Sequence, residues 1–154
     1  MSLDSQLDPQ ALIRTLGMAR HPEGGWYVET FRAASAAGER SAVTAIYFLL
    51  EHGQRSHWHT VDAAEIWLWH AGSPLHLLLS ADGCATETIL LGADFATGQR
   101  PQAVVPVGVW QAAESRSGWS LVSCIVAPAF DFAGFRMAPD GWAPAAGNAN
   151  DPRT

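Results

Sequence analysis

The sequence predicts an all-β fold, a sandwich or a closed barrel, preceded by one short helix. From Trp26 onward the chain is a series of short runs rich in β-branched and aromatic residues, each ended by Gly, Pro, Asp or Ser. No helical pattern separates these runs, which disfavours a parallel sheet because parallel strands need long crossovers. With 154 residues, 48% of them hydrophobic, the chain has the size and apolar content of one globular domain.

The helix comes first in the chain and the strands follow. Asp8 and Pro9 supply a cap and a first-turn proline, and Gly17 a stop, so we expect a short amphipathic helix over Gln10–Leu16. We expect an ordered core over about residues 10–142 of a single domain 1–154, with a frayed tail at 143–154. The expected strands are Trp26–Phe31, Ala42–Leu50, Ser56–Thr60, Glu65–Ala71, Leu75–Ser80, Thr86–Leu91, Gln102–Val105, Val109–Ala113 and Trp119–Val126.

Composition excludes several classes of function. The net charge is −6 and the charges are scattered, so neither nucleic acid nor a membrane surface is an expected partner. All nine basic residues are arginines, and the absence of lysine excludes a Schiff-base mechanism and a P-loop. Cys84 and Cys124 lack a Cys-x-x-Cys spacing and are expected to be free thiols. With neither a signal-peptide pattern nor a long apolar run, we expect a cytoplasmic protein.

The most informative segment lies between Gly53 and Gly72. His57 and His59 alternate with Trp58 on an expected strand, which predicts that both imidazoles share one face while Trp58 points to the other. A hairpin connection would return Glu65 beside them on the next strand. Two imidazoles and a carboxylate can hold a divalent transition metal, or can serve as a base and its orienting partner without one.

These residues resemble the first motif of the cupin superfamily, which runs Gly, His-x-His, Glu, Gly. Its second motif, Pro-x-Gly followed by His, is matched by Pro106–Gln111, with Gln111 where the histidine normally stands. A wider resemblance, from about Leu12 to Trp142, is to the group of unknown function called cupin family five. It is carried by His21-Pro22-Glu23-Gly24-Gly25-Trp26-Tyr27, Asp62–Trp67, Val105–Ala112 and Val126–Phe132.

The resemblance implies a double-stranded β-helix, the jelly-roll barrel of cupins, similar in fold to deoxysugar-nucleotide epimerases and seed storage cupins. It also implies a homodimer, and no activity common to the group. His57, His59, Glu65 and Gln111 form a candidate site for one divalent transition metal ion, and a site without metal is the alternative. Glutamine supplies one neutral oxygen, so this set would bind softer divalent ions less tightly than three imidazoles.

Further residues are candidates to surround a ligand. Trp67 and Trp69 share the face of Glu65, and together with Trp110 and Gln111 they would line a pocket suited to a flat or ring-shaped organic molecule. The family resemblance alone adds His21 and Glu23 as rim residues. Tyr47, on the strand before the His-x-His run, is the candidate proton donor. Trp58, on the opposite face, would suit a subunit interface.

The leading hypothesis is an isomerase or epimerase acting on a carbonyl compound or sugar. In this hypothesis His57 or His59 removes a proton next to a carbonyl, Glu65 orients the imidazole, and Tyr47 or water returns a proton. A metal-dependent oxygenase is an alternative within the enzyme class. A barrel that holds a small ligand without turnover, like a storage cupin, is the alternative outside it.

Overall fold

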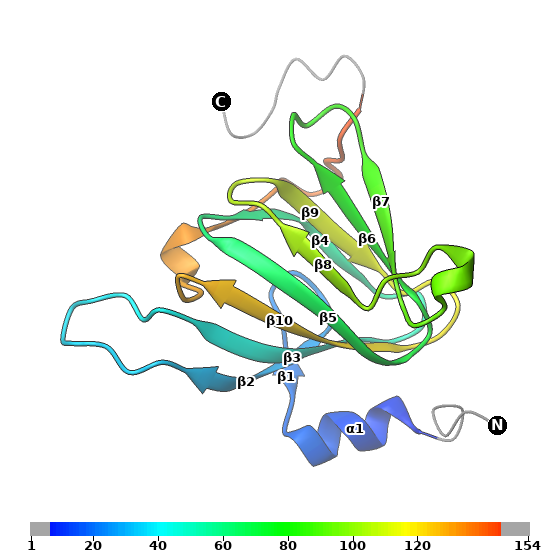
Figure 1. The fold of residues 1–154 in the computed structure, drawn as a ribbon, viewed down its shortest axis with the longest axis horizontal. Helices are drawn as coiled ribbons and strands as arrows, with labels where there is room; N and C mark the ends of the chain where they lie inside the picture. Colours follow the sequence, from blue (N-terminus) through cyan, green and yellow to red (C-terminus); the bar gives the residue numbers. More distant parts are fainter. Residues whose placement is uncertain (1–6, 146–154) are drawn as a thin grey trace.

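The chain folds into two antiparallel sheets that face each other, as the computed structural model shows for residues 7–145 (Figure 1). One sheet has six strands in the order β1-β2-β3-β10-β5-β8, and the other has five in the order β11-β4-β9-β6-β7. The strands are β1 Ala19–Arg20, β2 Trp26–Arg32, β3 Thr44–Leu50, β4 Arg55–Val61, β5 Ala64–Gly72, β6 Leu75–Ser80, β7 Glu87–Leu91, β8 Gln102–Val105, β9 Trp110–Glu114, β10 Ser120–Ala127 and β11 Phe135–Met137.

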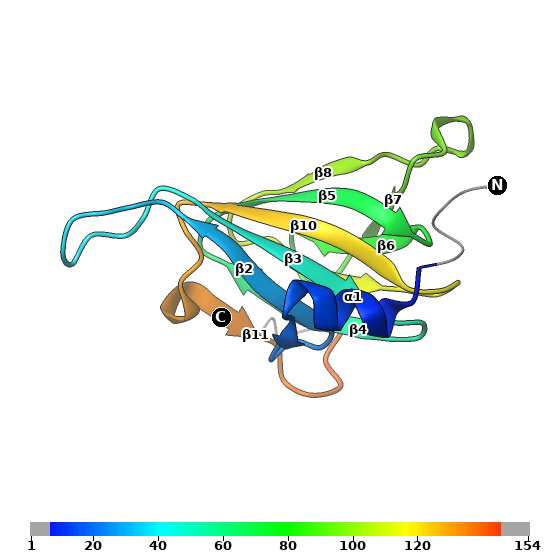
Figure 2. The same ribbon diagram turned by 90° about the horizontal axis from the view of Figure 1, so that it is seen from below.

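Helix α1, Pro9–Leu16, forms as the sequence predicts. The Asp8 side chain accepts a hydrogen bond from the Gln10 amide, and Gly17 ends the helix in the left-handed conformation, with φ at 66°. Ile13 and neighbouring apolar residues of α1 pack on the outer side of the six-stranded sheet, against Leu49 and Leu121. Figure 2 shows the helix lying across this face. The helix therefore covers apolar residues on the outer side of the six-stranded sheet.

The main core lies between the two sheets. Strand alternation sends Phe48 inward to meet Trp67, Leu77 and Val122, whereas Leu49 points outward to α1. A separate aromatic cluster forms where Trp58 and Trp110 meet Trp142 from the C-terminal segment. The side chains of the main core fill much of the space between the sheets, and the open cavity lies where polar residues are concentrated.

The expected strands are all present, with ends that differ by one or two residues. The sequence prediction missed two short edge strands, β1 and β11, and two single-turn 3-10 helices at Phe95–Thr97 and Phe132–Gly134. Such elements are too short to carry a hydrophobic period. Most of the predicted tail at 143–154 lies outside the described residues, and within them the Ala145 amide donates to the Gly83 carbonyl. Among residues 7–145 there is no helix long and apolar enough to cross a membrane.

Candidate functional site

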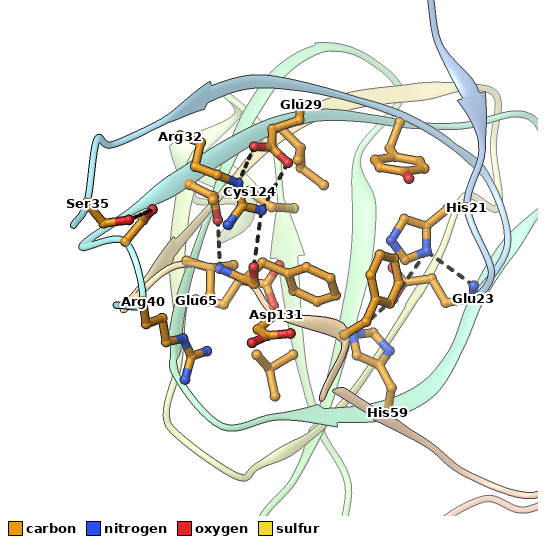
Figure 3. Close-up of a pocket in the computed structure, with 18 of the residues that line it drawn as sticks. His21, Glu23, Glu29, Arg32, Ser35, Arg40, His59, Glu65, Cys124 and Asp131 are labelled. Carbon is orange, nitrogen blue, oxygen red and sulfur yellow. Dashed lines mark hydrogen bonds and ion pairs between the residues drawn. The ribbon is translucent and has the colours of Figure 1, made fainter. Parts of the chain in front are cut away.

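A cavity of about 490 Å³ opens between the sheets (Figure 3). Strands β2, β3, β4, β5 and β10 line it, together with the segment 21–25 that precedes β2 and parts of the loops before β3 and after β10. The buried part holds four ionisable side chains, each of them less than a tenth exposed: His21, Glu23, His59 and Glu65. A cavity with an apolar wall and a few convergent ionisable groups is the usual form of a small-molecule site.

His59 and Glu23 form a buried pair at the cavity wall. The Nε2 atom of His59 lies 3.2 Å from Glu23 Oε2, and its Nδ1 atom lies 2.8 Å from the His57 carbonyl oxygen. A carbonyl only accepts hydrogen bonds, so Nδ1 carries the ring proton and Nε2 presents a lone pair to Glu23. The contact is then a hydrogen bond when Glu23 is protonated and donates. The geometry therefore favours one transferable proton shared by the two side chains.

The segment 21–25 brings Glu23 to this position through a tight glycine turn. The His57 amide donates to the Glu23 carbonyl at 2.8 Å, and the Gly24 amide donates back to the His21 carbonyl at 3.0 Å. Gly24 has φ at 110°, and a Cβ built there would lie 2.2 Å from the Arg55 carbonyl oxygen. Only glycine permits this close approach to β4, which places Glu23 against His59.

Glu65 is held by a hydrogen-bond relay that crosses from one sheet to the other. The Trp67 indole N–H of β5 donates to Gln111 Oε1 at 3.0 Å, and Gln111 Nε2 of β9 donates to Glu65 Oε2 at 2.8 Å. An indole N–H only donates, which fixes the orientation of the Gln111 amide and turns its NH2 group toward the carboxyl. All three side chains are buried. Gln111 is therefore a positioning residue for Glu65.

Burial sets the protonation states of these groups. It raises the pKa of Glu23 to about 8 and the pKa of Glu65 to about 7, because a charged carboxylate is poorly solvated there. It lowers the pKa of His21 to about 4, and it lowers the pKa of His59 as well. At neutral pH both imidazoles are uncharged, Glu23 is mostly protonated and Glu65 is partly ionised. The cavity thus contains a carboxylic acid and a carboxylate base side by side.

The cavity mouth carries two arginines, each held by a carboxylate. Arg32 makes a two-pronged contact with Glu29, at 2.7 and 3.1 Å, and also donates to the Phe130 carbonyl. Arg40 does the same with Asp62, at 3.0 and 2.7 Å, while its Nε donates to the Ala129 carbonyl. The bonds to Phe130 and Ala129 attach the mouth to the turn after β10, and Figure 3 shows Arg32 and Arg40 at this mouth.

The structure brings some of the predicted site residues together and separates others. His21, Glu23, His59 and Glu65 line one cavity, and His21 and Glu23 lie inside it rather than on its rim. The expected convergence of His57 with His59 is wrong. The pairing of β4 with β9 is irregular between Ser56 and His59, and the His57 ring instead contacts the carbonyls of Ala138 and Pro139, each at 3.1 Å.

The predicted aromatic lining is also corrected. Trp67 and Trp110 are fully buried in apolar clusters, and Trp69 packs against the core with its indole N–H on the Ser73 carbonyl. Tyr47 lies on the outer face of β3, near α1 and His70. Trp58 faces away from the cavity as predicted, but it is 3% exposed beneath the C-terminal segment and offers little surface to a partner.

Sequence reasoning missed several residues of the cavity. Tyr27 lines it and lies edge-on to His21, with ring centroids 4.6 Å apart, so the cavity tyrosine is Tyr27 rather than Tyr47. The alternation of Tyr27 with Val28 along β2 was the available signal. Cys124 of β10 is buried beside Glu65, and burial raises the pKa of its thiol. Arg32 and Arg40 had no sequence signal, because their place depends on how the loops fold.

Comparison with known proteins agrees with this architecture. A family model described as the cupin superfamily (DUF985) matches residues 10–138. The chain belongs to the cupin superfamily. This cupin is similar in structure to protein SO0799 from Shewanella oneidensis, at 35% identity and a TM-score of 0.81, over 86% of this chain and 85% of that one. It is also similar to a hypothetical protein from Leishmania major, at 32% identity and a TM-score of 0.79, over 88% and 90% of the two chains.

A more distant likeness concerns the fold alone. Oxalate decarboxylase from Bacillus subtilis matches this cupin at 11% identity and a TM-score of 0.60, over 77% of this chain and 29% of that one. Comparison with curated proteins finds no match. The jelly-roll fold predicted from the sequence is confirmed by these structures, whereas none of them carries an activity over to this chain.

The predicted metal ligands do not fit a metal ion. The Gln111 oxygen is occupied by the Trp67 indole and its NH2 group faces Glu65, so it presents no donor atom to a cation. The His57 ring lies on backbone carbonyls, and both nitrogens of His59 have partners. Within residues 7–145, no group of three or more His, Cys, Asp and Glu side chains is arranged to hold a metal. We therefore derive no chemistry through a metal.

Proposed function

We propose that this cupin binds a small organic carbonyl compound of the sugar type in its cavity and isomerises or epimerises it by proton transfer. The observation that carries the proposal is the buried His59–Glu23 pair, at 3.2 Å, in the same cavity wall as Glu65. Proton transfer to and from carbon needs a base and an acid of near-neutral pKa that both reach the ligand. Glu65, with its pKa raised by burial to about 7, and Glu23, raised to about 8, meet this requirement.

In the proposed reaction Glu65 is the base. Its carboxylate removes the proton from the carbon next to the carbonyl, and the electron pair of the broken C–H bond moves to the carbonyl oxygen. The Glu23–His59 pair supplies one proton to that oxygen, which gives a neutral enol. For the isomer, Glu65 returns its proton to the carbon that carried the carbonyl, while the hydroxyl on the other carbon gives its proton to the Glu23–His59 pair and becomes the new carbonyl. For the epimer, the proton returns to the opposite face of the original carbon, while the enol O–H gives its proton back to the pair and the first carbonyl re-forms. The sequence hypothesis had His57 or His59 as the base, but the His57 ring contacts the Ala138 and Pro139 carbonyls, and both ring nitrogens of His59 face protein groups.

Supporting residues keep the two carboxyl groups in different states. Gln111 donates to Glu65, which favours the ionised form of that carboxyl, while the His59 lone pair favours the protonated form of Glu23. Removing Gln111 or His59 would therefore change the pH at which the reaction runs. A direct ligand contact is not needed for this effect.

Deuterium uptake from D2O into aldoses, ketoses and other carbonyl compounds, followed by proton NMR, tests the proposal. Glu65→Gln keeps an acceptor for Gln111 and removes the base, so uptake should fall by roughly 100-fold or more. Glu87→Gln makes the same change at an exposed position of β7 and should keep full uptake. Equal uptake by the wild type and Glu65→Gln would refute the assigned role.

A cavity that only binds is the competing function. It would show ligand-induced thermal stabilisation by the same compounds, with no uptake of deuterium and no product. Homodimer formation is a separate prediction, which analytical ultracentrifugation would measure.

A further inference from the structure

Carboxyl groups outnumber guanidinium groups around the cavity. Five carboxyl groups line it, those of Glu23, Glu29, Glu39, Glu65 and Asp131, against the two guanidinium groups of Arg32 and Arg40. The chain contains no lysine, so no lysine ammonium group can enter from another part of the fold. The two imidazoles in the wall add no positive charge, since burial lowers the pKa of both His21 and His59.

The two cations are also already neutralised. Arg32 is chelated by both oxygens of Glu29, and Arg40 by both oxygens of Asp62. Each guanidinium additionally donates to a backbone carbonyl of the turn after β10. A phosphate or carboxylate on a ligand would have to break one of these pairs to find a counter-charge, and it would leave a carboxylate unpaired in the process.

The buried end of the cavity is still less suited to an anion. Glu65, Glu23 and Cys124 face one another there, and among the described residues that line the cavity the nearest cations are at the mouth. An anionic ligand group would lie beside carboxyl groups, in a place where water screens charge poorly. The remaining polar lining consists of hydroxyl groups, from Tyr27, Ser35, Ser41 and Thr44, which bind hydroxyls or amines equally well.

We propose that the cavity selects uncharged or cationic polyhydroxylated ligands and excludes anionic ones, so that unphosphorylated sugars and amino sugars bind and sugar phosphates do not. This inference rests on the proposed function, because it names the substrate class of the same cavity. Phe130 and Phe132 line the mouth, and Phe132 is 54% exposed, so their rings offer an apolar face against which the C–H face of a sugar ring can lie. The exclusion of anionic ligands also distinguishes this cavity from sites that bind sugar nucleotides, because their diphosphate requires cations.

The test compares ligands that share one skeleton and differ in charge. Thermal shift and calorimetry are measured with glucose, glucosamine and glucose 6-phosphate, and with fructose and fructose 6-phosphate. We expect at least one neutral or amino sugar to bind, and to bind at least about tenfold more tightly than its phosphorylated counterpart. Tighter or equal binding of a phosphate, or no binding by any neutral or amino sugar, overturns the proposal.

A charge variant at the mouth provides the second arm. Glu29→Gln removes the carboxylate that neutralises Arg32, so the preference against glucose 6-phosphate and fructose 6-phosphate should shrink by severalfold, whereas Glu87→Gln should leave it unchanged. An unchanged preference in Glu29→Gln would refute the role of the ion pair. Binding of neutral sugars without deuterium uptake supports this inference and refutes the proposed reaction. Deuterium uptake into a sugar phosphate supports the proposed reaction and refutes this inference.

Discussion

Raising the pH from about 6.5 to about 8 is expected to destabilise this cupin, because Glu23 and Glu65 lose protons that the folded state holds more tightly than the unfolded chain. Burial raises the pKa of Glu23 from 4.5 to about 8 and that of Glu65 from 4.5 to about 7. A group with the higher pKa in the folded state binds more protons there, so its contribution to stability is complete below the unfolded pKa and is lost as the pH rises through the folded pKa.

The histidines act in the opposite sense and over a lower range. Burial lowers the pKa of His21 from 6.5 to about 4 and also lowers that of His59, so their contribution grows with pH and is complete near pH 6.5. Below that pH the two imidazoles oppose the two carboxyl groups. Above it only the carboxyls remain, since burial raises the pKa of the Cys124 thiol well above 9.0 and it titrates later.

The size of the loss follows from about 1.4 kcal/mol per pH unit for each proton. Glu23 holds its extra proton over about 1.5 pH units of this range, which gives roughly 2 kcal/mol, and Glu65 over about half a unit, which adds under about 1 kcal/mol. The free energy of unfolding should therefore fall by about 3 kcal/mol between pH 6.5 and 8. In Glu23→Gln the fall should shrink to under about 1 kcal/mol, because only Glu65 still titrates in this range.

Equilibrium urea unfolding, followed by tryptophan fluorescence at several pH values across this range, measures the change. Glu23→Gln keeps a donor for His59 Nε2, since the amide NH2 replaces the carboxylic O–H, and so it should fold. Glu87→Gln, at an exposed position of β7, is the matched control, and its free energy of unfolding should fall with pH as steeply as that of the wild type. A fall of equal slope in Glu23→Gln would show that Glu23 is not the titrating group, and the reasoning would be refuted.

Three further outcomes follow from the site. Gln111→Leu leaves the Trp67 indole N–H and Glu65 Oε2 without their partner. The free energy of unfolding, measured by urea titration, should therefore fall by about 2–4 kcal/mol. An unchanged free energy of unfolding would contradict the relay. In the deuterium uptake assay Tyr27→Phe should slow uptake severalfold and Tyr47→Phe should not. The reason is that Tyr27 lines the cavity, whereas Tyr47 packs on the outer face of β3. A loss of uptake in Tyr47→Phe but not in Tyr27→Phe would contradict this placement. Treatment with EDTA should leave uptake unchanged, given that the Gln111 oxygen faces an indole, and loss of uptake restored by a divalent metal would overturn the metal-free assignment.

The fold was predictable because its signals are local. The caps of α1 and the alternation along β5 depend on residues close in sequence, and both patterns appear in the structure as expected. The alternation of Glu65 with Ile66 also placed that carboxyl on the inner face correctly. Strand periodicity says which face a residue occupies, but it does not say which residues of the other sheet lie opposite.

The site was predictable only in part for that reason. His57 was misplaced because an irregularity in the pairing of β4 breaks the alternation rule, and no single sequence pattern announces it. The indoles of Trp67 and Trp110 were assigned to the ligand, but Trp67 is packed in the core between the sheets and Trp110 in a separate aromatic cluster with Trp142. Glu23 was undervalued because Gly24 and Gly25 resemble an ordinary turn, whereas Gly24 closely approaches β4 and Gly25 closely approaches β3.

That glycine turn has a consequence for how such sites can diversify. His59 and Glu65 belong to strands whose pairing holds the sandwich together, whereas His21 and Glu23 are carried by five residues that precede β2 and contact β4 mainly through backbone groups. Half of the ionisable set therefore lies outside the strands whose pairing builds the two sheets. Replacing this short segment, with Gly24 and Gly25 kept, offers a route to new chemistry on an unchanged scaffold.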